Sequence, residues 1–375
     1  MPARADGTAL TAAERIAWLR LIRTDNVGPQ TFRQLLRREG SAEAALAALP
    51  RLTRRLGATP RIPSVAEAED EMAGLARLGG RFVASVEADY PALLKYASGA
   101  PPLLAVIGRS QPSLQRTVGI VGARNASTAG QKLTRQLATE LGAAGYVVVS
   151  GLARGIDAAA HRASLATGTV AALAGGMDRI YPEENVPLAA EIVAQGGMLV
   201  SEMPLGWEPR ARDFPRRNRL VAGLSLGIVV VEAARRSGSL ITARMALEQD
   251  REVFAVPGSP LDPRAEGCNA LIQQGARLVT GAADVVAALG EADPARRTLF
   301  EPDWKPEPDA DAAEAPPGDA ELERLLSALS YTPVPVDDLI RATGLPPGAM
   351  QTLLLGLDLD GRIEWSSGQL VALKG

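Results

Sequence analysis

Residues 117–125 read TVGIVGARN, and residues 146–155 read YVVVSGLARG. Each segment starts as a short apolar run rich in valine and then continues into glycine and small or polar residues. Four further apolar runs of this kind follow at residues 169–176, 197–201, 226–233 and 252–258, with helical stretches between them at 127–143, around 156–166 and from 239. Short apolar runs that alternate with helices predict a parallel sheet covered on both faces, which is a Rossmann-like doubly wound α/β fold.

Two smaller modules are predicted outside this core. Residues 11–75 read as short helices interrupted at NVGP (26–29), and residues 21–36 are compatible with a helix-hairpin-helix or with a plain helical turn. From residue 319 onward, three amphipathic segments and a hairpin predict a winged helix. The predicted division is a helical SAM or helix-hairpin-helix-like domain (1–80), an extended Rossmann-like domain (81–289), an acidic linker (290–318) and a winged-helix domain (319–375).

The composition excludes several kinds of site. The 375 residues include one cysteine, Cys268, and one histidine, His161. An intramolecular disulfide, a zinc site with several cysteine or histidine ligands, and a site needing two histidines are therefore impossible within the chain. Neither a signal sequence nor an apolar run of membrane-spanning length is present. We expect a soluble cytoplasmic protein with no metal site and no insertion into a membrane.

The net charge of −3 hides an uneven distribution. Residues 1–289 carry 33 basic and 27 acidic side chains, a net +6, whereas residues 290–375 carry 7 and 16, a net −9. A basic body favours a polyanionic partner. The excess of arginine over lysine is equally compatible with codon bias.

The loops that follow the predicted strands carry the candidate site, because ligands of open α/β sheets bind at the carboxyl ends of the strands. Gly122 and Arg124 follow the first strand, and Ser150, Gly151 and Arg154 follow the second. They suit an anion held by backbone N–H groups and guanidinium groups, or the glycines simply allow tight turns. The dinucleotide pattern G-x-G-x-x-G is incomplete, and no acidic residue ends the second strand, so an NAD or FAD site is disfavoured.

Three further features are open to two interpretations each. Residues 206–219 hold five arginines and Phe214 in a predicted loop, which suits phosphates and one stacked base, or is solvated surface charge. The residues Ser237, Gly238 and Ser239 form a phosphate nest or cap a helix. Asp157 and His161 lie four residues apart on one predicted helix; a buried histidine bonded by the aspartate is favoured over an acid–base pair.

A series of ordered blocks resembles the DNA-processing protein A (DprA/Smf) family: VGARNAST, SGLARGIDAAAH, GGMDRIYPEEN, SEMPLG, FPRRNRLVAGLS, VVVEAARRSGSLITA, VFAVPGSP and GCNALIQQGARLV. The resemblance spans about residues 117–280. It implies a protein that is not an enzyme, needs no cofactor, binds and protects single-stranded DNA, and loads the RecA recombinase onto it in natural transformation or DNA repair. Single-strand-binding protein is a further candidate partner.

The resemblance also implies a set of site residues. The DNA pocket of the family corresponds to Arg124, to Arg179 before Tyr181-Pro182, and to Phe214, Arg217, Asn218 and Arg219. Ser150, Gly151, Ser237, Gly238 and Ser239 line the same crevice, and Gly122, Arg154 and Arg216 complete the expected DNA-binding set. The family forms homodimers, which places the expected interface at Asn269, Leu271, Ile272 and Leu278.

Two alternatives to this function are weaker. A Rossmann-type nucleotide-processing enzyme of the phosphoribohydrolase kind would carry P-G-G-x-G-T, whereas residues 234–240 read ARRSGSL. A purely structural scaffold does not explain the basic strand ends. The predicted winged helix departs from a DNA-binding one, since residues 346–360 lack arginine and lysine; we expect it to bind a protein or to be dispensable for DNA affinity.

Overall fold

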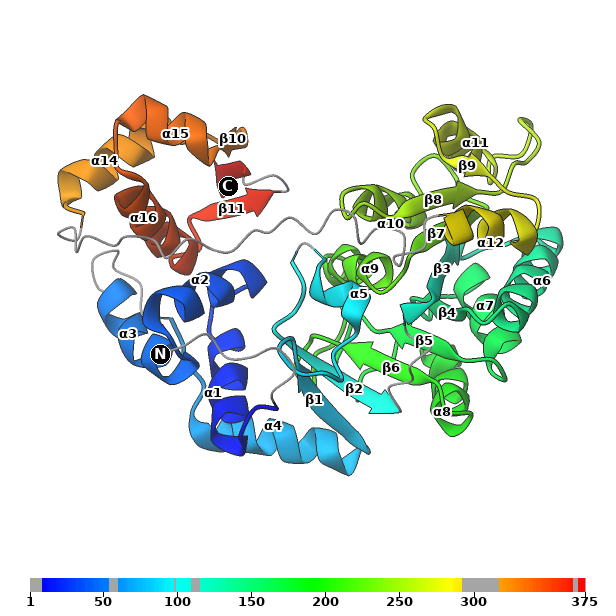
Figure 1. Ribbon diagram of the computed structural model, residues 1–375, viewed down its shortest axis with the longest axis horizontal. Helices are drawn as coiled ribbons and strands as arrows, with labels where there is room; N and C mark the ends of the chain where they lie inside the picture. Colours follow the sequence, from blue (N-terminus) through cyan, green and yellow to red (C-terminus); the bar gives the residue numbers. More distant parts are fainter. Residues whose placement is uncertain are drawn as a thin grey trace. The chain divides into compact units, whose positions relative to one another are not determined.

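The computed structural model describes residues 9–53, 60–97, 99–108, 115–291, 317–366 and 370–374. They form two compact units (Figure 1). Unit 1 combines the described residues of 10–68 with those from 317 onward, and unit 2 contains those of 69–291. Among the described residues, no helix is both long and apolar enough to cross a membrane.

Unit 2 is built on one sheet whose strand order is β1-β2-β6-β5-β4-β3-β7-β8-β9. The strands are β1 (Gly80–Ala84), β2 (Leu103–Gly108), β3 (Thr117–Gly122), β4 (Val147–Ser150), β5 (Thr169–Ala172), β6 (Met198–Ser201), β7 (Gly227–Val231), β8 (Glu252–Ala255) and β9 (Arg277–Leu278). Neighbours from β6 to β9 pair in parallel, and β1 and β2 extend one edge in antiparallel fashion. The predicted Rossmann-like parallel core is therefore confirmed.

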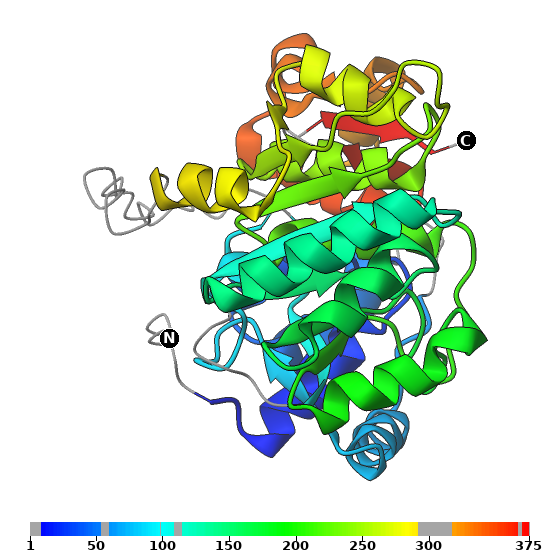
Figure 2. The same ribbon diagram turned by 90° about the vertical axis from the view of Figure 1, so that its right-hand side faces the viewer.

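Helices cover both faces of this sheet because successive residues of each buried strand point to opposite sides. Val118 and Ile120 pack with α6 (Thr128–Ala143), α7 (Ile156–Ser164) and α12 (Ala282–Glu291). Figure 2 shows α6 and α7 running across that face. Helix α8 (Val186–Ala194) contacts β5, β6 and α7.

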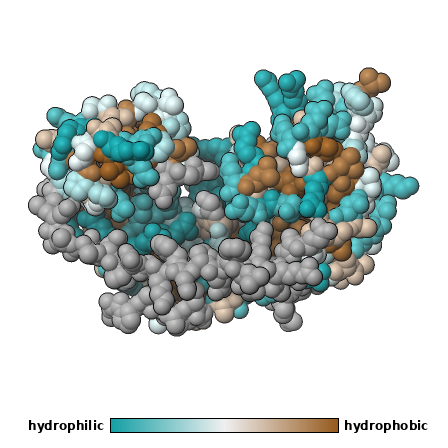
Figure 3. Space-filling model, turned by 45° about the horizontal axis from the view of Figure 1, so that its top comes forward, coloured by the Kyte–Doolittle hydropathy of each residue, from teal (hydrophilic) through white to brown (hydrophobic). Residues whose placement is uncertain are grey.

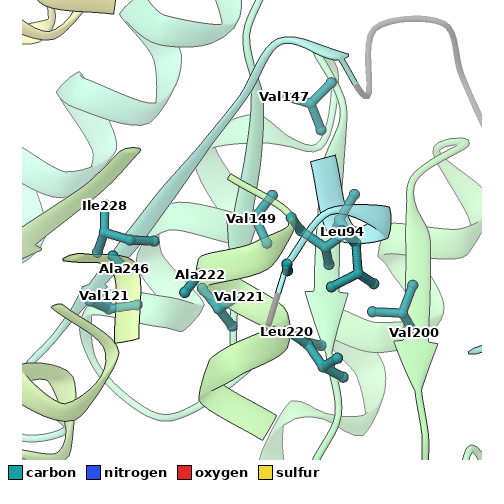
Figure 4. Close-up of a cluster of buried hydrophobic side chains, with 14 of the residues drawn as sticks. Leu94, Val121, Val147, Val149, Val200, Leu220, Val221, Ala222, Ile228 and Ala246 are labelled. Atoms are coloured by element: carbon teal, nitrogen blue, oxygen red, sulfur yellow. The ribbon is translucent and has the colours of Figure 1, made fainter. Parts of the chain in front are cut away.

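The opposite face is buried by a second apolar cluster. Val149 and Val200 point into it from the sheet, and Leu94 of α5 (Ala92–Lys95) and Leu220 of α9 (Asp213–Gly223) lie beside them (Figure 4). Helices α10 (Gly238–Leu247) and α11 (Glu266–Gln273) contribute the rest of the cover. Cys268 is part of this core, and burial raises the pKa of its thiol to about 11, so it stays protonated and unreactive.

Unit 1 contains an N-terminal helical domain and a winged helix. The helices of the first are α1 (Ala12–Ile22), α2 (Pro29–Glu39) and α3 (Ala42–Thr53); α4 (Val65–Arg77) contains the boundary with unit 2. The winged helix consists of α14 (Asp319–Ala328), β10 (Val334–Pro335), α15 (Val336–Thr343), α16 (Pro347–Leu359), β11 (Ile363–Ser366) and β12 (Leu370–Leu373). Local signals set the ends: Thr11 and Glu14 form a capping box on α1, and Gly344 ends α15 in the left-handed conformation.

Two sequence predictions need correction. The arginine-rich segment 206–219 is a loop only in its first half, because α9 begins at Asp213 and carries the segment's last three arginines. The predicted linker 290–318 starts too early, since α12 continues to Glu291. Residues 292–316 of that linker lie outside the described residues, and the predicted domain limits stay predictions.

Candidate nucleic-acid interface

The candidate site lies along the carboxyl ends of β3, β4, β5, β6 and β7. The chain winds outward from β3 through β4, β5 and β6, then returns to the other side of β3 with β7. Loops after the strands diverge at such a point, and ligands of open α/β sheets bind there. All the residues predicted to bind DNA end or follow one of these five strands, so the fold brings them to the end of the sheet where these strands finish.

Arg124 and the rings of Phe214 and Tyr181 form the centre of this strand-end site. The Arg124 guanidinium lies 5.2 Å from the centroid of the Phe214 ring, and the Phe214 and Tyr181 rings meet edge to face at 5.5 Å. Arg124 is exposed, and Tyr181 is 51% exposed. An arginine with aromatic neighbours offers a phosphate contact beside a stacking surface. The sequence used Tyr181 only as a landmark, because its contact with Phe214 joins the loop after β5 to helix α9.

Three further arginines along this edge are about half exposed. Arg154 forms an ion pair with Glu184 at 2.9 Å, and Arg179 lies 3.6 Å from Asp178, with side chains 59% and 49% exposed. Arg216 is 47% exposed and donates from Nε to Oε1 of Glu202 at 3.0 Å. The partners of Arg154 and Arg179 lie at the surface, where ion pairs are weak, so a phosphate can compete for these two guanidinium groups. Arg216 stays held by the buried Glu202 carboxylate and offers the exposed part of its guanidinium. These residues are therefore available to a polyanion.

Arg219 is held more firmly inside the protein. Its guanidinium donates to a carboxylate oxygen of Glu202 and to the backbone carbonyl of Gly99. The Glu202 side chain is only 5% exposed and contacts both Arg216 and Arg219. Glu202 thus fixes two arginines of α9 from below. The sequence block SEMPLG contains this residue, but its pairing could not be read from sequence because the partners lie on another element.

Arg217 lies beneath the site and not on its surface. The residue is 6% exposed, and its guanidinium donates to the carbonyls of Gly151 and, at 2.9 Å, Ala172. The buried Asp157 carboxylate accepts the N–H groups of Gly151 at 3.1 Å and Ala153 at 3.3 Å. Burial raises the pKa of Asp157, while the Arg217 charge and these hydrogen bonds oppose that rise. Arg217 and Asp157 together hold the loop that follows β4.

The small polar residues of the site have structural partners. Ser150 is buried and donates to the Ile120 carbonyl at 2.6 Å. Ser237 caps α10, its hydroxyl accepting the Ser239 N–H at 3.4 Å, which confirms the capping interpretation. Asn218 donates to the Gly238 carbonyl at 3.3 Å. Gly122 leaves no room for a side chain, because a Cβ there would collide with the Val231 carbonyl.

The sole histidine is a core residue. His161 Nδ1 lies 2.7 Å from the Thr169 hydroxyl, and within the described residues Nε2 has no hydrogen-bond partner. Burial lowers the pKa of His161 to about 3, so the ring is neutral at physiological pH. The expected bond with Asp157 is wrong, because the Asp157 carboxylate turns toward the N–H groups of Gly151 and Ala153.

A carboxylate occupies the position where nucleotide-binding folds of this class place a phosphate. Glu232 follows β7, and one oxygen accepts the Ser127 N–H at 2.8 Å at the start of α6 while the other accepts the Ser127 hydroxyl. The N-terminus of the helix after the first parallel strand is a common phosphate site. Here the negative charge comes from the protein itself, a feature that sequence reasoning missed although Glu232 stands directly after a strand.

The residues predicted to form a dimer interface differ in exposure. Leu278 is 50% exposed, whereas Leu271 and Ile272 are partly buried against the core. Ile272 and Leu278 also line an open groove with Pro257 and Pro260. Figure 3 shows apolar surface on the side of unit 2 where α10 and α11 lie. Asn269 exchanges hydrogen bonds with Gly258 at 3.2 and 3.0 Å.

The fold and this arrangement define a doubly wound α/β protein with arginines and aromatic rings along its strand ends. Among the described residues, no group of three or more His, Cys, Asp or Glu could hold a metal ion. The profile of DNA recombination-mediator protein A matches residues 81–290. Profiles of a DprA-like N-terminal HHH domain and of a DprA winged helix domain match residues 12–74 and 307–369.

Individual relatives agree with these matches. Protein Smf of Escherichia coli (strain K12) is 40% identical over 290 residues, covering 76% of this chain and 75% of that protein. DNA processing protein DprA of Bacillus subtilis (strain 168) is 43% identical over 235 residues, covering 62% and 77%. The chain therefore belongs to the DNA recombination-mediator protein A (DprA/Smf) family, as the ordered sequence blocks predicted.

Two solved structures are similar to this chain. The X-ray structure of DNA processing protein A from Streptococcus pneumoniae superposes with a TM-score of 0.60 at 32% identity, covering 74% of this chain and 98% of that one. DNA processing protein A from Helicobacter pylori, described with a single-stranded DNA binding mode, gives 0.50 at 30% identity, covering 54% and 93%. The helix-hairpin-helix and winged-helix predictions are confirmed together with the family.

Proposed function

We propose that the site at the carboxyl ends of β3, β4, β5, β6 and β7 in unit 2 binds single-stranded DNA. The observation that carries the proposal is the cluster of Arg124, Phe214 and Tyr181, which places an exposed guanidinium over the Phe214 ring, whose edge-to-face neighbour is Tyr181. A single strand exposes both its phosphates and the faces of its bases, and this cluster can contact both. The single-stranded DNA binding named for the Helicobacter pylori relative supports the same substrate.

The exposed arginines extend this cluster into a track. Arg154, Arg179 and Arg216 are about half exposed. The surface carboxylates beside Arg154 and Arg179 can give way to a phosphate, whereas Arg216 is held by the buried Glu202 and presents the exposed part of its guanidinium. Three residues on the buried side of the site position it without facing DNA. Arg217 holds the loop after β4, and Arg219 with Glu202 holds the start of α9. The predicted DNA-binding set thus divides into residues that contact phosphate and residues that position them, with Ser150, Gly151, Asn218 and Ser237 in the second group.

The further role proposed is mediation of recombination. The bound strand would be protected and handed to a RecA-type recombinase, in natural transformation or in repair, with single-strand-binding protein as another partner. A homodimer through Leu278 and its neighbours belongs to the same proposal. We propose no catalytic step, and the Glu232 carboxylate at the start of α6 argues against a nucleotide-processing enzyme, because it occupies the usual phosphate position. The cytoplasmic location stays a prediction.

The proposal is tested by comparing labelled oligothymidine with a duplex of the same length in fluorescence anisotropy titrations at one salt concentration. We expect the single strand to bind at least about tenfold more tightly, because only it can stack bases on Phe214 and Tyr181. Equal affinity for both forms, or release of phosphate from added nucleotide, would refute it. Recombinase loading is checked separately by RecA ATP hydrolysis on strands covered by single-strand-binding protein.

A further inference from the structure

Helix α16 occupies the position of the recognition helix in the winged helix. In DNA-binding members of this fold class, that helix enters the major groove and needs cations for the phosphates beside it. Residues 346–360 contain no arginine or lysine, and they include Asp358 and Asp360. The helix therefore has the wrong charge for a duplex.

The burial of α16 indicates what it contacts instead. Met350, Leu354 and Leu357 belong to the apolar core of the winged helix. Leu355 and Leu359 are 4% and 0% exposed although they are not members of that core. They lie four residues apart and so share one face of the helix. A second face of α16 is therefore covered by something outside the winged helix.

The cover is the N-terminal helical domain of the same chain. Helices α2 and α3 contact α16 within unit 1 (Figure 1). The Thr31 hydroxyl of α2 donates to the Asp358 carboxylate, and Arg38 of α2 donates to the Thr352 hydroxyl at 3.4 Å. Asp358 is largely buried, and burial raises its pKa to about 6. The threonine hydroxyl gives this carboxylate a hydrogen bond in place of water.

Asn26 completes the contact from the turn between α1 and α2. Its side-chain amide donates to the Leu359 carbonyl at 2.9 Å, at the end of α16 where carbonyls lack helical partners. Asn26 has a left-handed backbone with φ of 60°, which asparagine tolerates better than most residues. Helix-hairpin-helix turns usually carry glycine here. The asparagine keeps the backbone conformation and adds an amide that recognises α16.

We infer that the recognition helix of the winged helix is a docking surface for the chain's own N-terminal domain. The hairpin turn, the element that would approach a DNA phosphate, is engaged by α16 at the same time. The occupant is the same polypeptide and not DNA, because the surface is apolar and acidic and its hydrogen-bond partners are Asn26, Thr31 and Arg38. This inference is independent of DNA binding by unit 2.

A disulfide tests the contact directly. A Cβ at Gly361 would lie 3.1 to 3.3 Å from the Asn26 side chain, so the double variant Asn26→Cys/Gly361→Cys places two thiols within bonding reach. The native Cys268 is buried and will not compete. We expect mild oxidation of the full chain to give an intramolecular disulfide, detected as a monomer with altered mobility and as one cross-linked peptide.

The control pairs Asn26→Cys with Tyr331→Cys, a 73% exposed winged-helix position in the turn between α14 and β10. Absence of a bond in the first variant, or equal bonding in both, would overturn the inference. A covalent dimer would show that docking occurs between copies and would also overturn it. As a second readout, Asn26→Gly should speed hydrogen exchange at residues 355–361 about threefold to tenfold, the loss of one hydrogen bond; unchanged exchange would contradict the inference.

Discussion

Arg216 and Arg217 are neighbours on α9, yet their side chains enter different environments. Arg216 is half exposed at the strand-end edge, whereas Arg217 is buried against Gly151 and Ala172 and lies near the Asp157 charge. The sequence FPRRNR predicted that both reach DNA. Sequence cannot say which side of a helix faces the sheet until the neighbouring elements are placed, so the division between contacting and positioning arginines came only from the structure.

Replacing the two arginines should have opposite effects on stability and DNA binding. Arg217→Ala leaves the buried Asp157 carboxylate without its cation and should lower the free energy of unfolding by about 3–5 kcal/mol. Arg216→Ala removes a half-exposed guanidinium, and because Arg219 still pairs with the buried Glu202 carboxylate, it should cost less than about 1 kcal/mol while weakening DNA binding. Urea unfolding and anisotropy titrations of both variants check this. Equal destabilisation by the two changes would contradict the assignment of Arg217 as a buried positioning residue.

The low pKa of the buried His161 makes the stability of the fold depend on pH. Its pKa is about 3 in the folded chain and about 6.5 in an unfolded one. Between these values the unfolded chain binds a proton that the folded chain does not, so stability falls as the pH falls from about 6.5 toward 3. Between pH 6 and pH 4 this residue should account for about 2–3 kcal/mol.

The measurement is urea unfolding of the wild type and His161→Gln across that range. The variant should show a flatter loss of stability, while Arg135→Gln, at an exposed position on α6, should follow the wild type. An identical pH profile in His161→Gln and the wild type would rule out a buried neutral histidine.

At the level of elements, the apolar runs predicted the strands well because each is short, buried and bounded by polar residues or glycine. The start of α6 shows where such reasoning stops. Ser127 was expected at the helix start, and it does cap the helix by accepting the Gly130 N–H at 2.9 Å. The Glu232 carboxylate that joins it comes from the end of β7, because β3 and β7 are neighbours in the sheet. That neighbour relation depends on strand order, which the sequence did not specify.

Glu232 should therefore stabilise α6 measurably. Glu232→Gln keeps the size but removes the charge at the helix start and should cost about 1–2 kcal/mol, since it weakens charge-assisted hydrogen bonds to Ser127 and the helix dipole. Glu184→Gln, whose carboxylate forms an exposed ion pair with Arg154, is the matched control and should change stability little. A loss in the control as large as in Glu232→Gln would contradict the capping role.

On the scale of the whole molecule, the net charge differs in sign between residues 1–289 and residues 290–375. The basic residues 1–289 include the strand-end arginines, and the acidic residues 290–375 include α16, whose surface suits a protein contact. Membership of the family could be predicted from ordered blocks because they fall on strand ends and turns, where the backbone tolerates few residues. The contact between α2 and α16 could not be predicted, because it joins segments more than 300 residues apart.

The proposed homodimer is tested at the exposed leucine of β9. Leu278→Arg places a charge on the apolar groove and should give monomers in sedimentation equilibrium, because an uncompensated charge in a buried interface is costly. Tyr96→Arg, at another exposed position of unit 2, is the control and should leave the mass of the assembly unchanged. A dimer that survives Leu278→Arg would place the interface elsewhere.

The central claim is that phosphates bind along the strand ends of unit 2, and the salt dependence of oligothymidine affinity tests it most directly. Arg124→Ala/Arg179→Ala should reduce the steepness of log K against log salt by about 1.4, or 0.7 for each lost single-strand phosphate contact. Lys132→Ala/Arg135→Ala removes the same charge from exposed positions on α6 and should leave the slope nearly unchanged. An unchanged slope in the first variant, or an equal change in both, would contradict the account.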